Sequence, residues 1–152
     1  MKKRIMKAVA LFSLAMMIIT FSASASAETN LASTYATPAS YERDEYNLYT
    51  SYGHFTVPGG TVIGKNVSST SSSTLKATYT RAAQAALTTI HNNPHLSGFD
   101  CDPNGVDGLF GDNTRNAVIS FQTTIRAYLD SNVSVDGDVG SQTWYWLEWA
   151  TI

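Results

Sequence analysis

The chain has 152 residues and a formal net charge of −2, and 43% of its residues are hydrophobic. Lys and Arg do not cluster after the first residues, which argues against a nucleic-acid-binding protein. Cys101 is the only cysteine, so no internal disulfide can form and the fold needs a hydrophobic core of its own. Such an unpaired thiol can be reactive or can form a disulfide with a second molecule. We favour a third interpretation, in which the thiol is partly buried and packs as a small hydrophobic group.

The chain begins with a predicted secretory signal peptide, residues 1–27. Basic residues at the start precede an apolar run from Ala8 to Phe21, and SASASA then offers a cleavage site that ends at Ala27. The run is shorter than the roughly 20 residues that a membrane span needs. We therefore expect export and cleavage, with no stable membrane insertion afterwards. Cleavage leaves all twelve acidic residues in an acidic chain, which an anionic cell surface would repel at long range.

Residues 28–76 are predicted to form an irregular extension and linker that is rich in Tyr, Ser and Thr and lacks helical periodicity. Within them, HFTVPGGTVI places two β-prone runs around Pro58, Gly59 and Gly60, which predicts a short β-hairpin with its turn there. A lone hairpin is marginal in water, so it must pack on another element. The stretch 66–74 is predicted to be a flexible linker.

Residues 77–152 are predicted to form a compact three-helix bundle, which makes the fold mainly α. Helical spacing starts near Thr78 and stops at the sequence NNP, and a second helix of roughly 12 to 17 residues follows a loop. A short third helix places Trp144 and Leu147 in the core. The residues predicted to share the buried face of the second helix are Ala117, Val118, Phe121, Ile125, Tyr128 and Leu129.

The pattern Val-Asp-Gly-x-x-Gly-x-x-Thr occurs twice, from Val106 and from Val135, each time directly before a helix. Its Asp is predicted to accept hydrogen bonds from turn amides, and its first Gly to adopt a backbone conformation that other residues avoid. The second Gly turns the chain into the helix. We interpret both copies as devices that start a helix, with direct ligand binding by the two Asp residues as the alternative. The residues of this structural motif are Val106, Asp107, Gly108, Phe110, Gly111, Thr114, Val135, Asp136, Gly137, Gly140, Thr143 and Trp144.

Three further expectations concern the residues inside each copy. Asp112 and Ser141 are expected at the N-cap or in the first turn of their helices, where an oxygen satisfies free N–H groups. The two motif Thr residues are candidates for one more cap bond each. Phe110 and Val139, between the glycines, are expected to fix each loop to the core.

The segment VDGLFGDNTRNAVISFQ, followed by VDGDVGSQTWYWL, resembles the peptidoglycan-binding-like domain family over about residues 79–147. The resemblance implies a three-helix module that tethers a secreted protein to bacterial peptidoglycan, with Trp144 and Gln122 at positions that match the family. Family members usually have Pro after the second Gly of each copy, where this chain has Asp112 and Ser141. Both residues favour a helix start, so the expected fold is unchanged.

The candidate ligand-binding residues are Tyr145, Trp149, Trp146, Gln122 and Arg115. Tyr145 and Trp149 are four apart and share a helix face, and with Trp146 they suit stacking on a sugar or a stem peptide. The alternative is that the Tyr-rich extension folds back and buries them. Gln122 and Arg115 suit the amides and carboxylate of a stem peptide, with a satisfied structural Gln and a solvated helix charge as their alternatives.

No metal, cofactor or catalytic group is predicted. Asp100, Asp102 and Asn104 copy the first half of a calcium loop, but Gly111 occupies the twelfth position, where a bidentate Glu is needed. A zinc site is also not expected, because Pro94 interrupts the helix that would align its ligands. The zinc ligands considered are His91, His95 and Cys101.

The sequence favours a secreted, non-catalytic protein associated with the cell wall, which binds the glycan or the stem peptide of peptidoglycan. A wall enzyme is a further candidate partner. One alternative is a small cell-wall hydrolase or its accessory subunit, in which the extension supplies the chemistry. Another is a protein-interaction module on the same fold.

Overall fold

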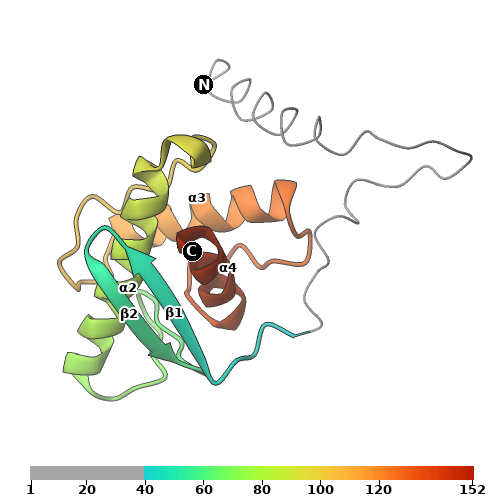
Figure 1. The fold of residues 1–152 in the computed structure, drawn as a ribbon. Helices are drawn as coiled ribbons and strands as arrows, with labels where there is room; N and C mark the ends of the chain where they lie inside the picture. Colours follow the sequence, from blue (N-terminus) through green and yellow to red (C-terminus); the bar gives the residue numbers. More distant parts are fainter. Residues whose placement is uncertain (1–39) are drawn as a thin grey trace, which may run out of the picture.

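A computed structural model describes residues 40–152, so the predicted signal peptide lies outside the described residues. The fold is mainly helical, with one two-stranded antiparallel hairpin, as predicted (Figure 1). Within residues 40–152, no helix is both long and apolar enough to cross a membrane. The elements in chain order are β1 (Glu45–Thr50), β2 (Gly53–Pro58), α2 (Ser73–Asn92), the 3-10 helix η2 (Pro94–Leu96), α3 (Asp112–Tyr128) and α4 (Ser141–Thr151).

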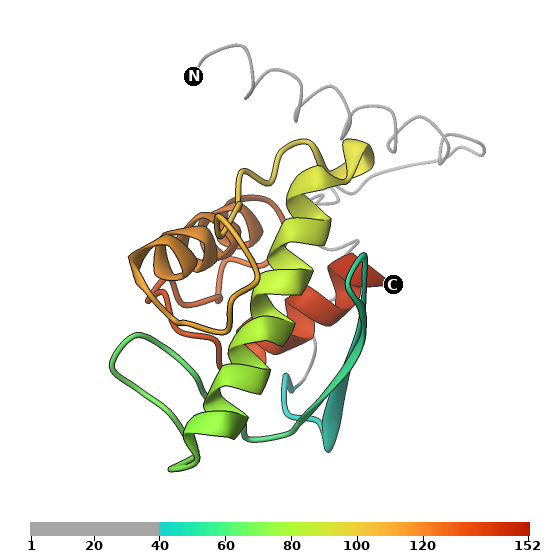
Figure 2. The same cartoon turned by 90° about the vertical axis from the view of Figure 1, so that its left-hand side faces the viewer.

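Helix α2 is the central element, because it contacts α3, α4 and both strands. In Figure 2, α3 lies on one side of α2 and the hairpin on the other, while α4 crosses behind. The helix begins at Ser73, earlier than the apolar spacing indicated, because the Ser72 hydroxyl accepts a hydrogen bond from the Leu75 N–H and caps it. Ser73 and Thr74 are therefore helical rather than part of a linker. The helix ends before Pro94, as predicted.

The hairpin exists, but the predicted position of its turn is wrong. Its strands pair Tyr46 with Val57 and Thr50 with Gly53, so the turn lies at residues 51–52. The Pro58-Gly59-Gly60 segment instead ends β2, where the Gly59 N–H donates to the Asp44 carbonyl at 2.7 Å. The first run of the predicted hairpin, which became β2, pairs with the earlier strand β1. In β1, Tyr46 and Leu48 alternate inward, so β1 also has the apolar face that a paired strand needs.

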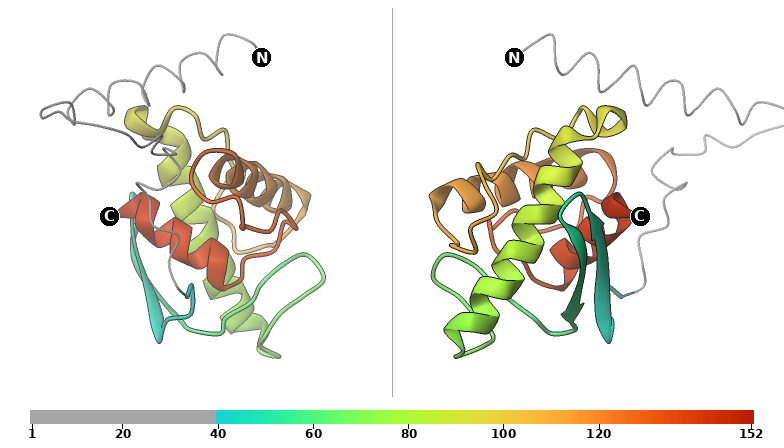
Figure 3. Two further views of the ribbon diagram at one scale, coloured as in Figure 1. Left: turned by 90° about the vertical axis from the view of Figure 1, so that its right-hand side faces the viewer. Right: turned by 60° about the vertical axis from the view of Figure 1, so that its left-hand side comes forward.

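The hairpin and the helices share one hydrophobic core. Tyr46, Leu48 and Ile63 are completely buried in the same cluster as the helix residues. A direct hydrogen bond of 2.9 Å joins the Trp144 indole N–H to the Thr61 carbonyl. Both views in Figure 3 show the hairpin next to α2 and α4. The hairpin is therefore stabilised by packing on the helices, as its small size requires.

Helix α3 follows its predicted face with one exception, and the two predicted core residues of α4 are buried. Phe121 and Ile125 of α3 are completely buried, and so are Trp144 and Leu147 of α4. Tyr128 was expected on the buried face but is exposed in the last turn of α3. Leu129, the next residue and the C-cap of α3, packs against the core instead.

Candidate functional site

Each copy of the repeated motif forms a tight loop, named elbow one (residues 106–114) and elbow two (residues 135–143). In elbow one, Asp107 Oδ1 accepts a hydrogen bond from the Leu109 N–H at 2.8 Å. In elbow two, Asp136 Oδ1 accepts one from the Asp138 N–H at 2.9 Å. The Leu109 N–H and then the Gln84 amide lower the pKa of Asp107 from its ordinary value. The predicted role of the two carboxylates in the turns is confirmed.

The first glycine of each elbow has a positive φ, +81° at Gly108 and +79° at Gly137. Both also pack closely on the preceding helix. A Cβ at Gly137 would lie 2.8 Å from Arg115 Cγ and 3.0 Å from Ile119 Cγ1. The prediction of a special backbone conformation is confirmed, and the tight packing gives glycine a second reason to occupy the site.

The helix starts differ from the predicted caps. Gly111 and Gly140 are the N-caps, with φ of −93° and −107°, and neither helix has a side-chain cap bond. Asp112 and Ser141 lie in the first turn, as predicted, but their oxygens do not bond the free N–H groups. Their partners lie outside the elbows: Lys65 Nζ at 2.6 Å from Asp112 Oδ1, and Glu42 Oε1 at 2.7 Å from Ser141 Oγ.

A buried glutamine holds elbow two together. The Gln122 side-chain N–H groups face Asp136 Oδ1 at 3.0 Å, the Asp138 carbonyl at 2.9 Å and Thr143 Oγ1 at 3.0 Å. Its carbonyl oxygen accepts from the Gly137 N–H at 2.9 Å. Gln122 is only 2% exposed. Because its amide is fully occupied, the geometry favours a structural Gln over a ligand-binding one.

Gln84 on α2 does the same for elbow one, and the sequence pattern did not reveal it. Its side-chain N–H groups face Asp107 Oδ1 at 2.9 Å, the Leu109 carbonyl at 3.2 Å and Thr114 Oγ1 at 3.0 Å. Its carbonyl oxygen accepts from the Gly108 N–H at 2.9 Å. Two features of the sequence could have revealed it. Gln84 is the single polar residue in the Ala-rich stretch 82–86, and the helix before each copy of the motif contains a Gln.

The motif threonines do not cap their helices. The Thr114 hydroxyl donates to the Leu109 carbonyl and the Thr143 hydroxyl to the Asp138 carbonyl, both at 3.3 Å. Arg115 bonds to elbow two, since its guanidinium donates a hydrogen bond to the Asp136 carbonyl at 3.0 Å. These side chains stabilise the loops, and a role of Arg115 toward a stem-peptide carboxylate stays a prediction.

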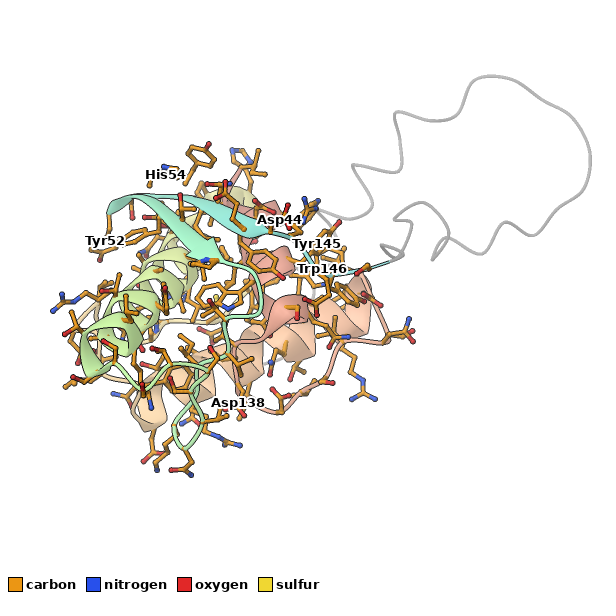
Figure 4. All side chains as sticks on the ribbon, turned by 90° about the horizontal axis from the view of Figure 1, so that it is seen from below. Asp44, Tyr52, His54, Asp138, Tyr145 and Trp146 are labelled. Carbon is orange, nitrogen blue, oxygen red and sulfur yellow. The ribbon has the colours of Figure 1, made fainter. Side chains whose placement is uncertain are left out.

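The predicted aromatic surface on α4 is largely covered. Trp146 was expected on the surface but is 4% exposed, because the rings of Tyr145 and Trp149 pack against it at centroid distances of 5.3 Å and 5.5 Å. The Tyr41 ring packs on the Tyr145 ring in an edge-to-face contact. The Arg43 guanidinium lies over the Tyr145 ring, 4.9 Å from the ring centroid. The extension therefore folds back over Tyr145. Trp149 remains 40% exposed. Elbow two is separate from the aromatic cluster, since Figure 4 shows Asp138 well away from Tyr145 and Trp146.

A groove of about 370 Å³ lies between elbow one and the first turns of α2. Leu109 stands at its edge with 70% of its surface exposed. The groove is mostly apolar and carries one ammonium group, which suits a ligand with both methyl groups and a carboxylate. The lining residues are Ser73, Lys76, Ala77, Gly108, Leu109, Phe110 and Gly111.

The loop before elbow one contains the residues considered for metal binding. The Asp102 carboxylate accepts from the Asn104 N–H at 2.8 Å, and Asn104 has a φ of +60°, so these residues form a turn. Cys101 is completely buried in the core. Across residues 40–152, no three His, Cys, Asp or Glu side chains are grouped to hold a metal ion.

We expect Cys101 to be inert toward alkylation in the folded protein. Desolvation by burial raises the pKa of its thiol from 9.0 to about 12. The thiolate fraction below the ordinary pKa is therefore about a thousandfold lower than in the unfolded chain. Iodoacetamide labelling at mildly alkaline pH, followed by mass spectrometry, should be slow in buffer and fast in denaturing urea. Equal labelling rates in both would contradict this burial.

Comparison with known families supports the interpretation of the two elbows. Residues 80–147 match the family described as "Putative peptidoglycan binding domain". Searches of curated proteins and of solved structures gave no match. The matched segment includes both elbows, the two glutamines that hold them and helix α3. With its doubled Asp-Gly elbow set between helices, the segment 80–147 is similar to the peptidoglycan-binding domain family.

Proposed function

We propose that the protein is an exported, non-catalytic protein that binds peptidoglycan at the bacterial cell wall. The observation that carries this proposal is the family match over residues 80–147, which spans nearly the whole helical part of the fold. The groove beside elbow one adds physical support, because it offers exposed apolar surface next to a cation. Trp149 offers a second, smaller contact for a sugar face.

The positions of the reactive side chains favour binding over hydrolysis. Glu148 accepts a hydrogen bond from the Asn47 N–H at 2.8 Å and pairs with Arg43 at 3.5 Å, so its carboxylate fastens β1 to α4. Asp130 accepts a hydrogen bond from the Tyr41 hydroxyl. Burial raises the pKa of the Cys101 thiol, which disfavours the thiolate that a cysteine nucleophile needs. These groups are used within the fold, which supports a binding protein rather than a wall hydrolase.

Sedimentation with purified peptidoglycan sacculi tests the proposed function. The native protein should appear in the pellet, and heat-denatured protein serves as the control for non-specific adsorption. Native protein that stays in the supernatant with intact helicity would contradict wall binding and favour the protein-interaction alternative. A fall in the turbidity of the wall suspension would contradict the non-catalytic assignment.

The same assay tests the aromatic contact. Trp149→Ala is expected to weaken retention about threefold to tenfold, because stacking of an exposed ring contributes about 0.5–1.5 kcal/mol. Tyr128→Ala removes another exposed ring, from the end of α3, and is the matched control. If both variants sediment like the unmodified protein, the wall contact lies elsewhere, with the groove as the next surface to test.

A further inference from the structure

Elbow two is covered by an extended segment of the same chain. Ile63 and Val139 form an antiparallel bridge with two hydrogen bonds, Ile63 N–H to the Val139 carbonyl at 3.1 Å and Val139 N–H to the Ile63 carbonyl at 2.8 Å. The next residue, Gly64, passes so close to the Asp138 carboxylate that a Cβ would not fit. An extended peptide therefore fits an elbow of this shape, and the tight fit at Gly64 is set by the Asp138 side chain, which elbow one replaces with Leu109.

Elbow one has the same shape but lacks this cover. The first glycines agree within 2° in φ, and the N-cap glycines Gly111 and Gly140 share a ψ of −167°. Phe110 corresponds to Val139. Within residues 40–152, neither the N–H nor the carbonyl of Phe110 forms a hydrogen bond. The surface next to Phe110 is the open groove, whereas Val139 is completely buried.

We propose that this groove binds the stem peptide of peptidoglycan as an extended strand paired with the backbone of Phe110. The bridge made by Ile63 at elbow two shows the pairing that such a strand would make, and it requires a peptide N–H and carbonyl spaced as in a main chain. The inference rests on the proposed function and deepens it by choosing the stem peptide over the glycan.

Charge supports this occupant. Lys76 lines the groove, and within residues 40–152 its ammonium has no ion-pair partner. Lys65, which also lies near the start of α3, is already paired with Asp112 at 2.6 Å. The free cation of Lys76 is therefore placed to receive a carboxylate of the stem peptide, while the glycan chain would leave it without a partner over most of its length.

A titration of the ¹⁵N-labelled protein with a soluble stem tetrapeptide, followed by amide NMR, tests the pairing. The Phe110 N–H resonance should move downfield and exchange more slowly with solvent, because it gains a hydrogen bond. The Val139 N–H is the internal control and should not move, since Ile63 already pairs with it. Glycan strands stripped of their peptides should leave Phe110 unchanged.

A charge-reversal pair tests the cation. Lys76→Glu should weaken tetrapeptide binding about threefold to tenfold, as expected for an exposed ion pair with a hydrogen bond. Arg126→Glu makes the same charge change on the exposed surface of α3 and should leave the affinity unchanged. Equal losses in both variants would show only a general charge effect and overturn the specific contact.

The outcomes separate the two proposals. If the protein sediments with sacculi but the tetrapeptide leaves Phe110 unmoved, the stem-peptide inference is wrong while the proposed function stands. Loss of sedimentation together with an unmoved Phe110 contradicts both. A Phe110 N–H that is already slow to exchange without ligand would mean that the groove is filled by residues 28–39 or by a second copy of the chain, which also overturns the inference.

Discussion

Replacing Gly137 by Val is expected to lower the free energy of unfolding by about 3 kcal/mol. A side chain at φ +79° costs about 1–2 kcal/mol in backbone strain, and overpacking against a helix adds about 1–3 kcal/mol. The added Cβ would press on Arg115 and Ile119 of α3, and the rest of the Val side chain would need still more room. Urea denaturation followed by far-UV circular dichroism measures the loss.

Two other glycines separate strain from packing. Gly60 has a φ of +72°, and a Cβ there would meet no atom within 4 Å, so Gly60→Val should show the strain cost of about 1–2 kcal/mol alone. Gly111 has an extended φ of −93° and open surroundings, and the N-cap preference for Gly over Ala opposes the entropic gain, so Gly111→Ala should change stability by less than about 1 kcal/mol. If Gly137→Val costs no more than Gly60→Val, close packing against α3 does not contribute.

Replacing Gln122 by Leu should also lower the free energy of unfolding by about 3 kcal/mol. Leu has a similar volume but no polar atoms, so the buried Gly137 N–H loses its acceptor and Asp136 loses a donor. A buried polar group left without a partner costs about 1–3 kcal/mol, and elbow two would lose several bonds together. Thermal unfolding by calorimetry measures the effect, and Gln84→Leu should give a similar loss at elbow one.

Gln142 provides the matched control. Its side chain also bonds a loop, accepting from the Ser134 N–H at 3.1 Å and donating to the Asn132 carbonyl at 3.3 Å. Both bonds are exposed, so water replaces them, and Gln142→Leu should cost less than about 1 kcal/mol. Equal losses for Gln122→Leu and Gln142→Leu would mean that burial of the amide adds nothing.

Local chemistry explains why the elbows were predictable from sequence. Asp-Gly followed by a second Gly determines a turn within a few residues, and the carboxylate and the positive φ at Gly108 act inside that short range. The hairpin depends on which of three β-prone runs pair, and this choice is made by packing on α2 and α4. Its turn was therefore misplaced, although its existence was predicted correctly.

The candidate site was harder to predict because it depends on contacts between distant residues. The helical wheel of α4 correctly placed Trp144 inside, but it contained no information on the Tyr41 and Arg43 side chains that cover Tyr145. Gln84 was missed because a helix pattern treats a lone polar residue as solvated. Its partner Asp107 lies in a loop 23 residues further along the chain.

The bond from Trp144 to Thr61 and the bridge from Ile63 to Val139 have a practical consequence for protein engineering. A fragment cut to residues 80–147 would discard the hairpin and expose to water the faces of α2 and α4 that the hairpin covers. Such a fragment would have an exposed apolar surface, prone to aggregation, that is buried in the full protein. A transferable unit of this protein therefore has to include the hairpin and the segment that joins it to α2.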